Sequence, residues 1–74
     1  MKITHSVRSD QVYIAFKDIE AGEAVAQHPI VDDRLRVLIV LDIDAEGCLI
    51  GIDVDGARGL PPEILEGAVR VDTN

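Results

Sequence analysis

Residues 37–54 read VLIVLDIDAEGCLIGIDV, and this stretch decides the fold. Its first five residues are apolar and mostly β-branched, which is typical of a strand covered on both faces rather than of a helix. The polar residues 44–47 follow at the spacing of a turn, and Gly47 suits the left-handed position that closes a type I turn with a bulge. Residues 50–55 then alternate apolar and polar side chains. The stretch therefore predicts a β-hairpin whose first strand is central.

The turn also predicts a register for this hairpin. On one surface apolar residues face each other, Val40 opposite Ile52 and Leu38 opposite Val54. On the other surface an apolar strand faces a mixed one, Ile39 opposite Asp53 and Leu41 opposite Gly51. Because the second surface needs cover from water, we expect Ile39, Leu41 and Asp53 to lie in an interface with another copy of the chain.

Alternating patterns predict further strands on the N-terminal side of the hairpin: Met1–Val7, Gln11–Lys17 and Glu23–Val31. The first two are expected to form a hairpin of their own. Pro29 cannot donate a hydrogen bond to a ladder, so the third strand is expected at a sheet edge.

After the hairpin, residues 61–66 predict a short helix that begins with proline and ends before Gly67. Residues 68–71 are expected to add a short extended segment, and residues 72–74 to be frayed. The fold class predicted is α+β, mainly β. The chain is expected to form one domain over residues 1–74, an antiparallel β-meander of four to five strands with one short C-terminal helix.

The small size of the chain favours self-association. Seventy-four residues make one small domain, and Tyr13 and Phe16 are the only aromatic residues. The core must therefore be built from aliphatic side chains, and a domain of this size buries a modest share of its surface. Burying the second face of the sheet against another copy would relieve that shortage, so we expect a homodimer.

The formal net charge of −7 limits the classes of partner that we expect the chain to bind. Nucleic acids and anionic membranes are bound through clustered Lys and Arg, which this chain lacks, so neither is expected and a basic protein is favoured. No signal peptide and no apolar run of about 18 residues is present, so we expect a cytoplasmic protein. Cys48 is the single cysteine and is expected to be a small buried or half-buried side chain rather than a reactive thiol.

The carboxylates of the hairpin suggest a metal site as an alternative. Asp42, Asp44, Glu46, Gly47 and Asp53 imitate the spacing of a calcium-binding EF-hand loop. The flanks are β-branched rather than helical, however, and the predicted register places Asp42 and Asp53 on opposite faces.

Two interpretations of the individual carboxylates stay open. Asp42 and Asp44 share a strand face and would suit a magnesium ion or acid-base catalysis, or they simply bind the turn backbone. Asp53, if buried, needs a partner such as Arg36 or Arg58, or an arginine of a second subunit.

No other constellation indicates catalysis. His5 and His28 have no metal-ligand spacing around them, and there is no Ser-His-Asp order, glycine-rich phosphate loop or Walker-type lysine. No cofactor is expected.

The run V-x-D-x-D-x-x-G-x-L-x-G-I-D, carried by residues 40–53, resembles the small prokaryotic family described as domain of unknown function 2283. The resemblance extends to the opening residues, to DQVYIAF at 10–16 and to the proline-led helix. This chain departs from the family pattern at His5-Ser6, where a Tyr-Asp pair is usual, and at Asp53, where Glu is more common. The family has no established activity, and some members are encoded beside putative ribonuclease-type toxins. The resemblance thus implies an antitoxin-like or regulatory partner protein.

Together these observations favour a non-enzymatic, homodimeric protein-interaction module with an acidic surface. The alternative is a metal-dependent enzyme or metal-binding regulator that uses Asp42, Asp44 and Asp53.

Overall fold

The computed structural model describes residues 1–72, which form one sheet and one short helix. The elements in chain order are β1 (Lys2–Ser6), β2 (Gln11–Ala15), β3 (Ala26–Ile30), β4 (Leu38–Ile43), β5 (Leu49–Asp55), the single-turn 3-10 helix η1 (Ala57–Gly59), α1 (Pro62–Glu66) and β6 (Val69–Val71). The mainly β fold with a short C-terminal helix is therefore confirmed. Thr73 and Asn74, expected to be frayed, lie outside the described residues.

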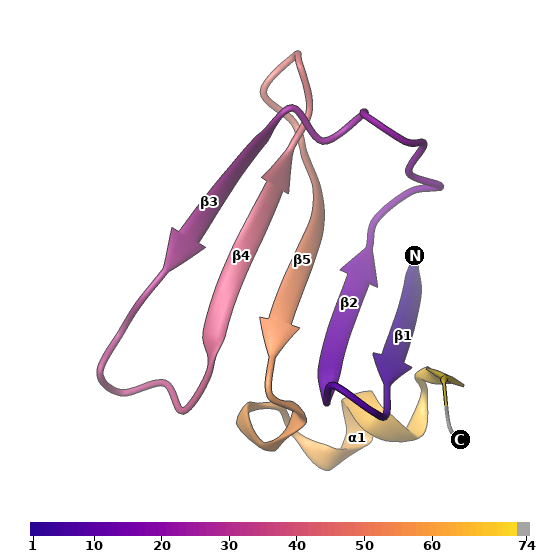
Figure 1. Cartoon of the computed structure of the whole chain (residues 1–74), viewed down its shortest axis with the longest axis vertical. Coiled ribbons are helices and arrows are strands. Elements are labelled where there is room, and N and C mark those ends of the chain that lie inside the picture. The colour runs from indigo at the N-terminus through magenta and orange to yellow at the C-terminus, as the bar shows by residue number, and fades with distance from the viewer. Residues whose placement is uncertain (73–74) are drawn as a thin grey trace.

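The strands are ordered β3-β4-β5-β2-β1-β6 in a six-stranded sheet (Figure 1). All neighbours are antiparallel except β1 and β6, which are parallel, so the sheet is mixed. The chain does not form a single meander, because β2 pairs with β5 and residues 16–25 carry the chain past β5 and β4 to β3. As expected, β4 is an interior strand and β3, which contains Pro29, is an edge strand.

The short strand β6 extends the sheet beside β1. Asp72, expected to be frayed, accepts hydrogen bonds from the Ser6 hydroxyl at 2.8 Å and from the Val7 backbone N–H at 3.1 Å. These bonds hold the last described residue to the end of β1.

The turn between β4 and β5 forms as predicted. Gly47 has a φ of 86°, its N–H donates to the Asp44 carbonyl at 3.1 Å, and the Asp44 N–H donates to the Cys48 carbonyl at 2.9 Å. This pattern is a type I turn closed by a residue in the left-handed region.

A second bulge then shifts the register of the hairpin by one residue. Ile43 pairs with Leu49 and Asp42 pairs with Gly51, so Ile50 has no partner on β4. The remaining pairs all differ from the predicted ones: Leu41 with Ile52, Val40 with Asp53, Ile39 with Val54 and Leu38 with Asp55. The predicted register was wrong because one extra residue in a strand reverses which side chains share a face.

With this register, one surface of the sheet, here called the apolar face, collects aliphatic side chains from β1 to β5. The pairing of facing residues places on it Ile3, Val12, Ile14, Ile30, Ile39, Leu41, Ile43, Ile52 and Val54. At one end of this face Val12 and Val54, 0% and 2% exposed, are buried with Ala57, and Leu60 and Leu65 pack against them. The buried cluster of the described chain lies there, and Ile50, 3% exposed, is buried separately toward the other end of β5.

The helix covers only that end of the apolar face. Figure 1 shows α1 at the lower end of the sheet, beside the β1–β2 turn, and not across the strands. α1 has five residues, of which Leu65 packs against the core cluster. Leu41 and Ile43 lie outside that cluster and are half-buried.

Candidate functional site

The opposite surface, here called the polar face, is crossed by a chain of hydrogen bonds. Tyr13 on β2 reaches over β5, and its hydroxyl donates to Asp42 Oδ2 on β4 at 2.6 Å. The Gln27 side-chain amide on β3 donates to Asp42 Oδ1 at 3.1 Å. The Tyr13 ring passes over Gly51, where an added Cβ would lie 2.0 Å from the hydroxyl oxygen. Gly51 is therefore required by close approach.

Asp42 is a structural carboxylate. It is 7% exposed, and each of its oxygens has a donor, which is the condition for burying such a group. The expectation that Asp42 binds the turn backbone was therefore wrong. Burial and the hydrogen bond to Asp42 raise the pKa of Tyr13, so the phenol remains a protonated donor.

Asp44 occupies the role expected of a turn residue. Its Oδ1 accepts hydrogen bonds from the backbone N–H groups of Glu46, at 3.0 Å, and Cys48, at 2.8 Å. An aspartate that caps its own loop in this way stabilises the turn.

Asp53 lies on the polar face, opposite Tyr13 on β2 and Val40 on β4. Burial raises its pKa, and the nearby carboxylates of Asp42 and Asp55 raise it further. Of the two arginines expected as partners, Arg58 is directed elsewhere, since its guanidinium donates to the backbone carbonyl of Arg36 at 3.2 Å. Asp53 is thus a half-buried carboxylate beside other negative charges.

The three carboxylates proposed as metal ligands do not converge. The bulge at Ile50 brings Asp42 and Asp53 to one face, contrary to expectation, but the carboxylate of Asp44 turns to its loop. Within residues 1–72 no three His, Cys, Asp or Glu side chains are grouped to hold a metal ion.

The interface candidates are divided between the two faces. Ile39 and Leu41 lie on the apolar face, opposite Val54 and Ile52, whereas Asp53 lies on the polar face. The expectation that all three share one surface was wrong because of the shifted register. Ile39 and Leu41 are half-buried on a face that α1 covers at one end only.

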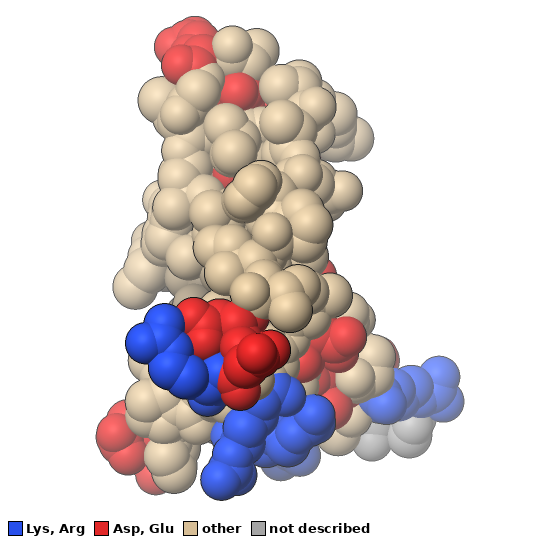
Figure 2. All heavy atoms as spheres, turned by 90° about the vertical axis from the view of Figure 1, so that its left-hand side faces the viewer, with Lys and Arg blue, Asp and Glu red and all other residues tan. Residues whose placement is uncertain are grey.

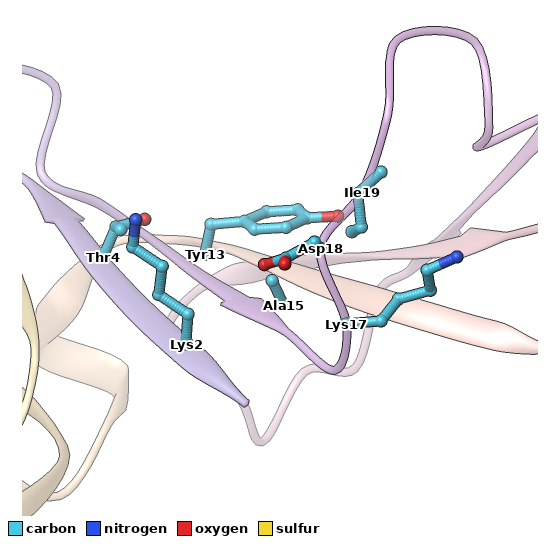
Figure 3. Close-up of a pocket in the computed structure, with 7 residues that line it drawn as sticks. All are labelled: Lys2, Thr4, Tyr13, Ala15, Lys17, Asp18 and Ile19. Carbon is cyan, nitrogen blue, oxygen red and sulfur yellow. The ribbon is translucent and has the colours of Figure 1, made fainter.

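A shallow pocket of 320 Å³ lies on the polar face (Figure 3). It is lined by Lys2, Thr4, Tyr13, Ala15, Lys17, Asp18 and Ile19. Tyr13 is bonded to Asp42 and Lys17 is paired with Glu23, so these two polar groups already have partners. Sequence reasoning missed this arrangement, although an isolated glycine in a strand, here Gly51, indicates a close approach.

The arginines of the chain lie away from the β4–β5 turn, whereas carboxylates lie at both ends of the sheet. Residues 16–25 and the β4–β5 turn form what we call the acidic end, which holds Asp18, Glu20, Glu23, Asp44 and Glu46 with Lys17 as the basic residue of these segments. Lys2 lies beside them, since it lines the pocket together with Lys17 and Asp18. All five arginines lie in segments at the other end or in β6: Arg8, Arg34, Arg36, Arg58 and Arg70. Figure 2 shows Lys and Arg gathered at the lower end with acidic side chains among them, and an acidic group at the upper tip.

The part of the chain that the structure describes contains no helix with the length and apolarity to cross a bilayer.

The close approach of Tyr13 to Gly51 predicts that the effect of a Gly51 substitution on stability depends on whether the Tyr13 ring is present. Gly51→Ala is expected to lower the free energy of unfolding by about 1.5–3 kcal/mol, because displacing Tyr13 removes a donor from the buried Asp42. In a Tyr13→Val background the same change is expected to be neutral or slightly stabilising, since alanine restricts the unfolded chain more than glycine.

Urea unfolding of the four proteins measures this cycle. Gly67→Ala is the matched control, because its Cβ would meet its nearest neighbour, the Ile64 carbonyl, at 3.9 Å. An equal cost of Gly51→Ala in both backgrounds would contradict the assigned contact.

The environment of Asp53 predicts a pH-dependent effect. Its raised pKa means that the folded state holds the proton more tightly than the unfolded state, so the charged carboxylate opposes folding. Protonated Asp53 therefore favours the folded state. This contribution is lost as pH rises from about 4, the pKa of Asp53 in the unfolded chain, through its higher pKa in the folded state. Asp53→Asn is therefore expected to stabilise the fold at pH 7 by up to about 1 kcal/mol, a size typical of partly exposed charges, and less below pH 4. Thermal unfolding at both pH values, with Asp33→Asn on an exposed loop as control, checks the result; destabilisation at pH 7 would refute it.

Comparison with known proteins found no family model, no curated protein and no solved structure that matches this chain. The family resemblance of residues 40–53 therefore stays a prediction. The function has to be argued from the surfaces of the molecule.

Proposed function

We propose that the protein is a non-enzymatic interaction module that acts as a homodimer. The observation that carries this proposal is the apolar face, whose aliphatic side chains come from five strands while α1 covers one end. Domains are normally built from two packed layers around one core, and a five-residue helix supplies little of the second layer. A sheet face whose aliphatic side chains stay half-buried in the single chain is a candidate for a protein–protein interaction site.

The chemistry of the polar face supports a binding role over a catalytic one. Asp42 and Tyr13 are bonded to each other, and Asp44 is bonded to its own turn. A general base or nucleophile needs a partner in hydrogen-bond reach and an accessible reacting atom. Asp42, Tyr13 and Asp44 do not offer both, because their polar atoms are already engaged in these hydrogen bonds.

The proposal also includes a partner other than the second copy, a basic protein. We favour the acidic end as the surface that contacts this protein, in an antitoxin-like or regulatory role. Residues 17–19 line the pocket on the polar face together with Thr4, Tyr13 and Ala15, so this loop lies on the side of the sheet away from the apolar face. A dimer formed through the apolar face thus leaves the acidic loop accessible.

Dimerisation through the apolar face predicts different effects for two leucines of β4. Leu41→Lys is expected to convert a dimer into a monomer, because the charge would be buried between apolar faces. Leu38→Lys, whose side chain is 41% exposed on the polar face, is expected to leave the dimer unchanged. Sedimentation velocity at about 10 µM protein, a concentration well above the Kd of a stable dimer, distinguishes the two masses. A monomeric wild type would refute the dimer.

Binding of a basic partner through the acidic end predicts a charge-reversal effect that depends on position. A labelled lysine-rich peptide is expected to bind the wild type and to weaken as salt rises from about 50 to 200 mM, because the charges are exposed. Asp18→Lys with Glu46→Lys is expected to abolish binding measured by fluorescence anisotropy. Glu63→Lys with Glu66→Lys makes the same charge change on α1 and is expected to keep most of it. Equal losses in both double variants would show a general charge effect and contradict the assigned surface.

A further inference from the structure

We propose that the two copies pack apolar face to apolar face with their strands running in opposite directions, so that α1 of each copy covers the bare end of the other. This inference rests on the proposed homodimer and adds its geometry. It makes the second copy a structural part of each subunit's core.

The exposed area of the chain matches what such a dimer needs. The accessible surface is 5141 Å², whereas a compact protein of this mass exposes about 4,450 Å². The excess of about 700 Å² is close to the roughly 800 Å² that each partner buries in an interface of standard size. The radius of gyration, 12.4 Å, likewise exceeds the value of about 11.3 Å for a compact domain of this length.

Both ends of the apolar face bury an aliphatic residue, but the end opposite α1 also exposes large apolar ones. Val12 and Val54, at the end that carries the helix, are 0% and 2% exposed. At the other end Ile50 is 3% exposed, whereas Leu49, which pairs with Ile43, is 42% exposed and Phe16, which follows β2, is 40% exposed. Exposed apolar side chains that a second copy could cover therefore remain at the end opposite the helix.

The size of α1 places it at the end of such a stack. Two stacked sheets lie about 10 Å apart and fill that space with their own side chains, so a helix about 10–12 Å across has no room between the strands. Figure 1 shows α1 at the lower end of the sheet. With antiparallel copies, each α1 lies beside the upper end of the partner sheet, whereas with parallel copies both helices meet at one end and leave the other end without a helix.

Charge favours the same arrangement. The acidic end of each copy carries five carboxylates and Lys17, with Lys2 beside it. Parallel copies would place the two acidic ends together, where like charges repel, whereas antiparallel copies place them at opposite ends of the dimer.

Cys48 allows a direct measurement, because it is the single cysteine and lies in the turn at the acidic end. It is exposed, contrary to the expectation of a buried or half-buried side chain. A spin label on Cys48 of the otherwise unchanged chain reports the distance between copies by pulsed electron paramagnetic resonance. Antiparallel copies are expected to give about 25 Å or more, since the seven residues of β5 span about 23 Å. A distribution centred at about 10–15 Å, the gap between sheets, would overturn the proposed direction while leaving the dimer intact.

A second measurement uses the dissociation constant of the dimer. Leu49→Lys is expected to raise it at least tenfold, because Leu49 would face α1 of the partner. Val69→Lys is the control, since Val69 is 53% exposed and pairs with Thr4 on the polar face. An unchanged constant for Leu49→Lys, or an equal rise for Val69→Lys, would overturn the proposed contact. A monomeric wild type at all concentrations would instead remove the dimer itself.

Discussion

The unpaired residue at Ile50 determines which side chains of the sheet share a face. Without this extra residue, the apolar residues of β5 would lie opposite Leu38 and Val40, and Ile39 and Leu41 would lie opposite Asp53 and Gly51. With it, Ile39 and Leu41 lie opposite Val54 and Ile52, and the apolar face is continuous from β2 to β4. The same shift aligns Asp42 with Gly51 and brings it within reach of Tyr13. One bulge thus separates an apolar from a polar face.

Features that depend on neighbouring residues could be predicted from the sequence, and features that depend on distant pairs could not. The Gly47 turn, the edge position of the Pro29 strand and the proline-led helix each follow from local backbone preferences. The bulge was missed because a regular ladder after the turn satisfies the same local rules. The bond between Tyr13 and Asp42 joins residues 29 apart, on strands that the sequence did not show to be close. Gly51 was the available signal for it.

The polar face combines a satisfied network with one unsatisfied charge. Asp42 is buried at low cost because Tyr13 and Gln27 both donate to it. Asp53 has a raised pKa from burial and from Asp42 and Asp55, so its charge opposes folding of the single chain.

The distribution of apolar residues favours the proposed second copy over a larger helix as the second layer of the fold. Hydrophobic residues make up 47% of the chain, an ordinary share for a globular domain, yet the buried hydrophobic ones in the described part are Val12, Ile50, Val54 and Ala57. The chain is therefore not short of apolar side chains but of a surface to pack them against. A longer C-terminal helix would provide that surface only with more residues to order, at about 1.5 kcal/mol of conformational entropy each. A second sheet provides an apolar face that is already ordered by its own hydrogen bonds, and it is complementary by symmetry.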